Sequence, residues 1–160
     1  MILRNVRPDD TAAIVALNSA VVAVTSPMDA ARFCALLDVS AFCTVVESAG
    51  AVIGFILAMQ HGAAYDNANF QWFSARLNHF AYIDRVVIGQ AARGLGLGRR
   101  LYDHLAQAAQ QQGSLVMAAE MDLVPANPGS IAFHARYGFV ELGRRTLDSG
   151  KIVSMQIRGI

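Results

Sequence analysis

The stretch ARGLGLGRRLYDHL, residues 92–105, places three glycines at alternate positions just before two arginines, where a helix is expected to begin. Glycine is a poor helix residue, but it lets a ligand approach the backbone closely. A helix N-terminus carries unpaired N–H groups and about half a positive charge, so a cation there costs about 0.3–1 kcal/mol unless an anion lies beside it. Arg93, Arg99 and Arg100 therefore predict an anion site, with phosphate as the natural ligand. A glycine-rich turn followed by two solvated arginines is the alternative.

Two common phosphate-binding motifs fit these residues poorly. A dinucleotide-binding G-x-G-x-x-G loop requires glycine where Arg99 stands, and it opens the first β-α-β unit of a chain. A P-loop requires Gly-Lys-Ser/Thr, and residues 92–105 contain no lysine.

Asp84 is the first of two carboxylates that could accept a proton. It lies in the expected strand 80–88, at alternate positions with Tyr82, Val86 and Ile88. Partial burial would raise its pKa toward the range of a general base. The alternative is that Asp84–Arg85 forms a structural pair with a neighbouring loop, with ion pairing in place of a catalytic role.

Glu120 is the second carboxylate, between Ala119 and Met121 in the expected strand 114–124. The same argument from burial makes it a candidate base or substrate contact, with ion pairing again as the alternative. Glu47, at the end of the expected strand 42–48, is interpreted as a hairpin charge.

Turn residues and apolar spacing predict a single mixed α/β domain, residues 1–160, with helices packed on a central sheet. Asp9 or Asp10 is expected to cap the first helix. In the first half, the expected elements are a strand at 2–6, a helix carrying Ile14, Leu17, Val21 and Val24, a short helix within 25–37, and strands at 42–48 and 51–60 joined at Gly50. In the second half, they are a strand at 80–88, a helix carrying Leu97, Leu101, Leu105 and Ala108, a strand at 114–124, a helix from Asn127 to Gly138, and a hairpin of 138–147 with 150–159.

Residues 61–79 break this pattern and are expected to form a long irregular loop. Tyr65, Phe70, Trp72 and Phe73 are scattered among Gly, Asp and Asn residues. Long loops in compact domains are often functional, whereas rings that anchor the loop to the core would explain the same composition.

Composition excludes several classes of protein. The chain is 54% apolar and 16% charged, yet its longest clean apolar stretch, residues 51–59, is far short of the roughly 20 residues that a membrane-spanning helix needs. A net charge of +1 gives no electrostatic reason to expect nucleic acid or an anionic membrane as a partner.

The first ten residues and the two cysteines indicate a cytoplasmic protein. The opening MILRNVRPDD is charged and carries no evident secretory signal. Cys34 and Cys43 show no metal-ligand spacing, so no metal is expected, and they are interpreted as buried thiols in a reducing compartment.

The glycine-rich stretch resembles the acetyl-CoA motif of the GNAT acyltransferase family, Arg/Gln-x-x-Gly-x-Gly/Ala, in which Arg93, Gly96 and Gly98 are in register. The segment NPGSIAFHARYGF, residues 127–139, is similar to a second signature of that family, a short helix that begins at Asn and ends in Gly-Phe. The order of elements also resembles the family over nearly the whole chain. The resemblance implies the GNAT fold, a mixed and mostly antiparallel sheet in the order β-α-α-β-β-β-α-β-α-β-β.

The resemblance also implies how acetyl-CoA would bind. Asn127 would contact the cofactor, besides capping its helix. The strand end Val86, Val87 and Ile88 would pair with the pantetheine arm where this strand diverges from the next, and a backbone N–H there can serve as an oxyanion donor. Backbone N–H groups of one continuous turn would hold the pyrophosphate: Arg93, Gly94, Leu95, Gly96, Leu97, Gly98 and Arg99.

His134 stands where many members of the family carry a tyrosine that acts as acid near the CoA sulfur. A histidine with a pKa near 6.5 can donate a proton at neutral pH. Packing against the core beside Phe133 is its alternative role, and Tyr137 fills a slot that is usually apolar in the family.

The activity implied is transfer of an acetyl group from acetyl-CoA to a primary amine by direct attack. Residues 61–79 offer few acids beyond Asp66, which favours a small, modestly charged or amino-acid-like acceptor over a polycation. A catalytically silent acyl-CoA-binding module is the second hypothesis, and a homodimer is consistent with the fold.

Overall fold

The computed structural model describes residues 1–160, the whole chain. The strands are β1 (Ile2–Asn5), β2 (Phe42–Ser48), β3 (Ala51–Gln60), β4 (Phe80–Ile88), β5 (Val116–Val124), β6 (Val140–Thr146) and β7 (Ile152–Gly159). The helices are α1 (Thr11–Ser19), α2 (Ala30–Val39), α3 (Ala68–Ser74), α4 (Leu97–Gln111) and α5 (Pro128–Tyr137), with short 3-10 turns at Pro8–Asp10 and Gln90–Ala92.

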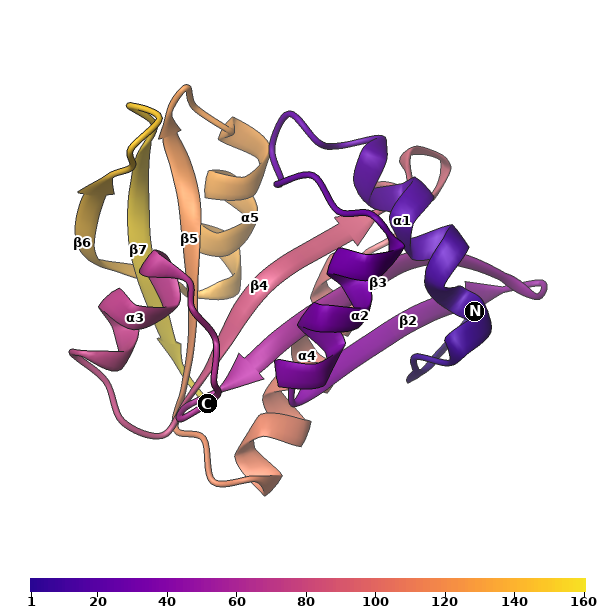
Figure 1. Cartoon of the computed structure of the whole chain (residues 1–160), viewed down its shortest axis with the longest axis horizontal. Coiled ribbons are helices and arrows are strands. Elements are labelled where there is room, and N and C mark those ends of the chain that lie inside the picture. Colours follow the sequence, from indigo (N-terminus) through magenta and orange to yellow (C-terminus); the bar gives the residue numbers. More distant parts are fainter.

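All seven strands form one sheet in the order β1-β2-β3-β4-β5-β7-β6. Every neighbouring pair is antiparallel except β4 and β5, which run parallel. The β4–β5 ladder joins only Phe80–Tyr82 to Val116–Ala118, and beyond these residues the two strands diverge (Figure 1). The predicted fold class is therefore confirmed, including the opening between these two strands.

A β-bulge at Asp84 corrects the predicted alternation along β4. Ile83 pairs with Ala58 and Arg85 pairs with Leu57, so Asp84 has no partner on β3. An extra residue reverses which face the following side chains occupy. Val87 consequently joins the same core cluster as Tyr82, whereas the predicted alternation put it on the opposite face.

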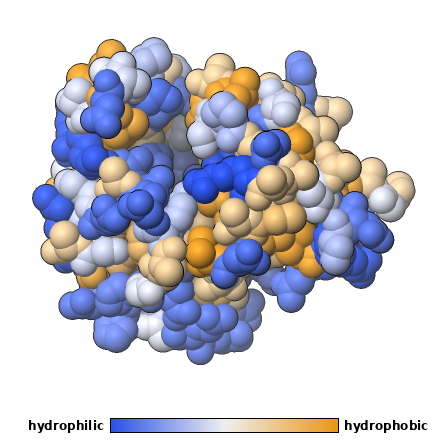
Figure 2. Space-filling model, viewed as in Figure 1, coloured by the Kyte–Doolittle hydropathy of each residue, from blue (hydrophilic) through white to orange (hydrophobic).

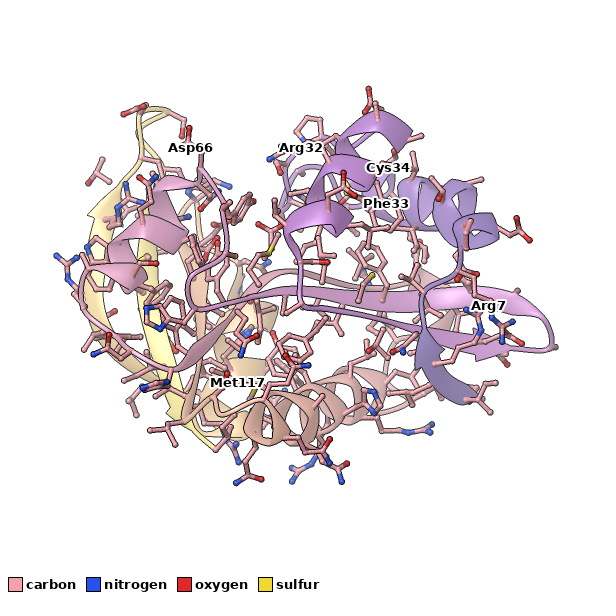
Figure 3. The ribbon with its side chains drawn as sticks, turned by 60° about the horizontal axis from the view of Figure 1, so that its bottom comes forward. Arg7, Arg32, Phe33, Cys34, Asp66 and Met117 are labelled. Carbon is pink, nitrogen blue, oxygen red and sulfur yellow. The ribbon has the colours of Figure 1, made fainter.

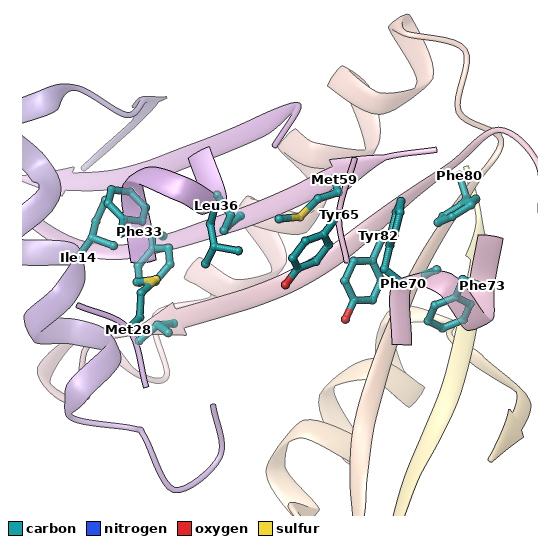
Figure 4. Close-up of a cluster of buried hydrophobic side chains, with 14 of the residues drawn as sticks. Ile14, Met28, Phe33, Leu36, Met59, Tyr65, Phe70, Phe73, Phe80 and Tyr82 are labelled. Atoms are coloured by element: carbon teal, nitrogen blue, oxygen red, sulfur yellow. The ribbon is translucent and has the colours of Figure 1, made fainter. Parts of the chain in front are cut away.

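Helices cover both faces of the sheet and create two apolar cores. α1, α2 and α3 pack on one face, where Phe33, Phe55, Phe73 and Tyr82 are almost fully buried (Figure 4). α4 packs on the other face against residues such as Met117, as the side view in Figure 3 shows. The sheet is therefore packed between two apolar cores, one on each face.

The structure differs from the predicted elements in two places. α1 ends at Ser19, because a further turn would present Val22 and Val24 to solvent without a core to cover; Val21 and Val24 lie in the turns that follow. The region expected to be an irregular loop contains the seven-residue helix α3, which is capped by the Asn67 side chain, 3.0 Å from the Phe70 N–H.

Three predicted details of burial are also corrected. Ala109, rather than Ala108, completes the buried stripe of α4. Cys34 is exposed on α2 and Cys43 is half-buried, so the prediction of two buried thiols is wrong for Cys34 (Figure 3). Asp10 stands at the start of α1, but its carboxylate binds the Arg4 guanidinium and the Arg7 N–H instead of capping the helix.

No helix of the structure is both long enough and apolar enough to cross a lipid bilayer.

Candidate functional site: a cleft between two diverging strands

A cleft of about 1040 Å³ opens where β4 and β5 separate. Its walls come from both strands, the turn before α4, α5, the α1–α2 segment with the start of α2, the start of α3 and the β6–β7 hairpin. The space-filling view shows the surface hollowed between the α5 side and the α1–α2 segment (Figure 2). The gap in the sheet therefore becomes a binding cavity that the helices line but do not fill.

One end of the cleft is formed by the backbone of the turn before α4. Gly94 and Gly96 have φ values of +78° and +72°, in the left-handed region that favours glycine, and open space lies where their side chains would be. The backbone N–H groups of residues 94–99 donate no hydrogen bond within the chain. Six consecutive unpaired donors at a helix start are typical of an anion site, and the binding of an anion here stays a prediction.

The residues predicted to hold the pyrophosphate lie together at this end, with differences among them. The Arg93 N–H donates to the Gln90 carbonyl oxygen at 3.3 Å, so the predicted backbone contact is wrong for Arg93. Arg93, Gly94, Gly96, Leu97, Gly98 and Arg99 line the cleft. Leu95 is 56% exposed and points away, so it can contribute only its backbone N–H. Arg99 is solvated, 3.7 Å from Asp103, and remains free to meet an anion.

α5 closes this end of the cleft. The Asn127 side chain caps α5, 3.2 Å from the Ser130 N–H, and it also lines the cleft. A Cβ on Gly98 would come within 3.3 Å of the Phe133 ring, so glycine there lets α4 and α5 approach each other closely. The capping role of Asn127 is confirmed, whereas its contact with a cofactor stays a prediction.

The strand end Val86–Ile88 forms one edge of the cleft. Val86 and Ile88 line it, and Val87 is buried in the core. All three residues lie beyond the last β4–β5 pair, on the edge of β4 that has no neighbouring strand. An extended ligand could pair with this edge as an added strand would.

Glu120 lies at the other end of the cleft, on β5 just past the point of divergence. Both of its carboxylate oxygens are 2.9 Å from the Tyr82 hydroxyl, which donates to them. Burial raises the pKa of Glu120 to about 7, the nearby Asp84 adds to the rise, and the Tyr82 hydroxyl and Asn69 oppose it. A carboxylate with this pKa can exchange a proton near neutral pH.

Asp84 faces the same end of the cleft from β4 and has different partners. The Tyr65 hydroxyl donates to one of its oxygens, and the Arg85 Nε donates to the other at 2.9 Å. Arg85 is 7% exposed and also donates to Asn18 at 3.0 Å, across the core to α1. The sequence left open whether Asp84 pairs with Arg85, and the structure shows that it does.

His134 lies behind the wall of the cleft, 5% exposed. Its Nδ1 is 2.8 Å from the Ser130 carbonyl oxygen, which can only accept, so Nδ1 carries the proton and Nε2 accepts from the Tyr102 hydroxyl at 2.7 Å. Burial lowers the pKa of His134, against the hydrogen bond to Ser130, which raises it. Both ring nitrogens are therefore occupied within the protein, an arrangement that matches the structural role left open by the sequence.

Several residues of the site escaped the sequence analysis. Tyr82 was counted only as a strand residue, although it holds Glu120, and Asn69 lies in the segment expected to be irregular. The Tyr65 ring packs with Phe70 in the core (Figure 4). Its hydroxyl donates to Asp84, a contact that its place among the loop aromatics does not predict. The rings thus anchor the segment, and Tyr65, Asn67 and Asn69 line the cleft as well.

Comparison with known proteins defines the class of this fold and site. The family described as "Acetyltransferase (GNAT) family" matches residues 12–139, which include both ends of the cleft. The chain belongs to the GNAT family of acetyltransferases.

Solved structures of other acetyltransferases share the whole fold at low identity. Ard1 from Thermoplasma volcanium has a TM-score of 0.78 and 19% identity, with 99% of this chain and 97% of that chain covered. The ribosomal-protein-alanine N-acetyltransferase from Brucella melitensis has a TM-score of 0.76 and 22% identity, with both chains covered completely. Salmonella typhimurium yncA, solved with its cofactor acetyl-CoA, has a TM-score of 0.73 and 23% identity, with 99% and 93% covered. No curated protein sequence matches this chain significantly.

The structure contains no group of three or more His, Cys, Asp or Glu side chains that could hold a metal ion.

Proposed function

We propose that this protein transfers an acetyl group from acetyl-CoA to the primary amine of a small or amino-acid-like acceptor. The observation that carries the proposal is the composition of one continuous cleft. Six unpaired N–H groups lie at one end, and at the other lies Glu120, with a pKa of about 7. An anion-binding end and a proton-accepting end in one cavity are what an acyl transfer from a diphosphate-bearing donor requires.

The residues present fit acetyl-CoA as the donor. The turn of residues 94–99 would hold the pyrophosphate, and the open edge of β4 at Val86–Ile88 would pair with the pantetheine arm. A backbone N–H on this edge would also stabilise negative charge on the thioester oxygen. Bound acetyl-CoA supplies the acetyl group as a thioester, which an amine can attack.

We assign Glu120 the role of general base. It takes a proton from the acceptor ammonium, so that the nitrogen lone pair is free to form the new N–C bond. The attached nitrogen releases its second proton to solvent as the C–S bond breaks. The departing thiolate takes its proton from solvent, because His134 holds its own proton toward Ser130. Tyr82 holds the Glu120 carboxylate in place, and Asp84 acts with Arg85 as a structural pair that also surrounds the amine with negative charge.

The occupied ring of His134 also supports the second hypothesis, a silent module that binds acyl-CoA without transfer. Mixing the protein with acetyl-CoA and a panel of primary amines, and following the release of free thiol, separates the two. Amine-dependent release that is lost in Glu120→Gln is expected for the enzyme. Saturable CoA binding with no release for any amine would establish the silent module, and failure of CoA to raise the melting temperature would contradict both.

We further propose that residues 1–160 act as one domain in the cytoplasm. Cys34 and Cys43 are both free thiols, which supports a reducing environment. The predicted homodimer stays a prediction that sedimentation can test.

A further inference from the structure

Six cationic side chains line the cleft, and five of them either have a partner or belong to the anion-binding end. The six are Arg32, Arg85, Arg93, Arg99, Arg136 and Lys151. Arg93 and Arg99 belong to the anion-binding turn, and Arg136 belongs to α5, which closes the same end. Lys151 lies 3.0 Å from Asp122 in an ion pair.

Arg85 is also unavailable to a ligand. Its guanidinium donates to Asp84, to Asn18 and to both the carbonyl and the hydroxyl oxygen of Ser26, at 2.9–3.2 Å. These bonds fasten the α1–α2 segment to β4 and occupy the donors of this buried side chain. Arg32 is therefore the cation that remains.

Arg32 has no carboxylate within ion-pairing distance. It lies in the first turn of α2, where the nearest acidic group in sequence, Asp29, caps the helix with its carboxylate 2.7 Å from the Arg32 N–H. A cation in the first turn is electrostatically unfavourable unless an anion approaches it. Its exposed side chain extends from α2 toward the segment that carries Asp66 (Figure 3).

Arg32 lies at the end of the cleft that also holds Asp84 and Glu120, which we call the acceptor end. Burial raises the pKa of the Tyr65 hydroxyl, and the nearby Arg32 guanidinium opposes that rise, which places the charge beside Tyr65. The same hydroxyl donates to Asp84. The acceptor end therefore presents two carboxylates in its depth, Asp84 and Glu120, and one unpaired guanidinium on its rim.

We infer that the acceptor is a zwitterion of the free amino acid type, whose amine lies at Glu120 and Asp84 and whose carboxylate pairs with Arg32. A guanidinium and a carboxylate form two parallel charge-assisted hydrogen bonds, and this pairing selects both charge and orientation. A simple alkylamine or an amino acid amide lacks the second charge. The inference rests on the proposed function and names its substrate class.

The test compares each common L-amino acid with its primary amide, which keeps the amine and removes the carboxylate charge. Binding to the CoA-saturated protein is measured by titration calorimetry, and thiol release is measured separately. The variants are Arg32→Gln, Arg32→Lys and the control Arg7→Gln, which removes an equal charge from an exposed arginine far from Arg32 (Figure 3).

We expect at least one amino acid to bind about tenfold more tightly than its amide. Arg32→Gln should abolish this preference, Arg32→Lys should keep part of it because a single ammonium cannot form the paired bonds, and Arg7→Gln should leave it intact. Equal binding of acid and amide, a preference that survives in Arg32→Gln, or no binding of any pair would each overturn the inference.

The two readouts separate this inference from the proposed function. Acetylation of amides without preference for the acids would leave the transferase in place and refute the role of Arg32. Arg32-dependent binding of amino acids without any acetylation would support a carboxylate-binding site at Arg32 and refute the transferase.

Discussion

The two ends of the cleft are built from different parts of the polypeptide. The donor end is the end at which we propose that acetyl-CoA binds. It consists of backbone N–H groups from one continuous turn, residues 94–99. The acceptor end consists of side chains from four separate segments, with Arg32, Tyr65, Asp84 and Glu120 as its main groups. A backbone site needs glycines at fixed spacing and leaves a motif in the sequence, whereas a side-chain site requires the fold to bring distant residues together and leaves none.

The largest expected effect concerns Glu120, the proposed general base at the acceptor end. We expect Glu120→Gln to lower kcat by about 10²–10⁴-fold, because the amide cannot take the amine proton. CoA affinity should stay within about twofold, since the donor end is separate. Steady-state kinetics and calorimetry with CoA measure the two effects.

The pH profile of the wild-type enzyme gives a control for this prediction. Glu120 must be ionised to act as a base and its pKa is about 7, so kcat/KM should fall about tenfold per pH unit below that value. If kcat/KM were constant from pH 5 to 8, a group other than Glu120 would have to take the proton of the acceptor.

Asp84 tests whether the two carboxylates of the acceptor end differ in role. Asp84→Asn removes the partner of the buried Arg85, with both side chains at most 5% exposed, and should lower the free energy of unfolding by about 3 kcal/mol. Urea denaturation measures this loss. A stable Asp84→Asn variant with a hundredfold lower kcat would instead make Asp84 the base.

His134 tests whether the donor end includes an acid. His134→Phe leaves the buried Tyr102 hydroxyl without its partner, so we expect a loss of about 2 kcal/mol in stability and a change in kcat of less than about threefold. Thermal denaturation measures the loss of stability. Thiol release measures kcat, at a temperature where both the variant and the wild type are folded. A fall in kcat of a hundredfold in the folded variant would restore His134 as the acid beside the sulfur.

Gly96 gives the smallest effect and tests the backbone character of the donor end. Valine at a φ of +72° is strained by about 1–2 kcal/mol, so the turn should distort and CoA affinity should fall about tenfold. Arg7→Gln, which removes an exposed charge outside the cleft, serves as a control that leaves the turn unchanged. Equal CoA affinity in Gly96→Val and the wild type would show that arginine side chains, not backbone N–H groups, hold the anion.

Much of the fold could be predicted because its signals are local. The strand at 80–88 and the hairpin of 42–48 with 51–60 were predicted with the bounds that the structure shows. α3 was missed because its rings are spread over only seven residues, too few to show a helical period. α1 was predicted too long because Val21 and Val24 continue the helical period. Val21 packs against the core from a turn and Val24 is exposed, so the helix itself ends at Ser19.

The sequence by itself determined the donor end, because positive φ angles and unpaired N–H groups are properties of neighbouring residues. Only the tertiary structure decided the acceptor end. The bulge at Asp84 reverses the face of the side chains that follow it on β4, and the Tyr82 hydroxyl binds Glu120 on the neighbouring strand. Arg85 is enclosed in a buried network, which leaves Arg32 as the unpaired cation of the acceptor end. The physical reason is that charge pairing and burial depend on groups brought together from far apart in the chain, and sequence spacing does not encode those distances.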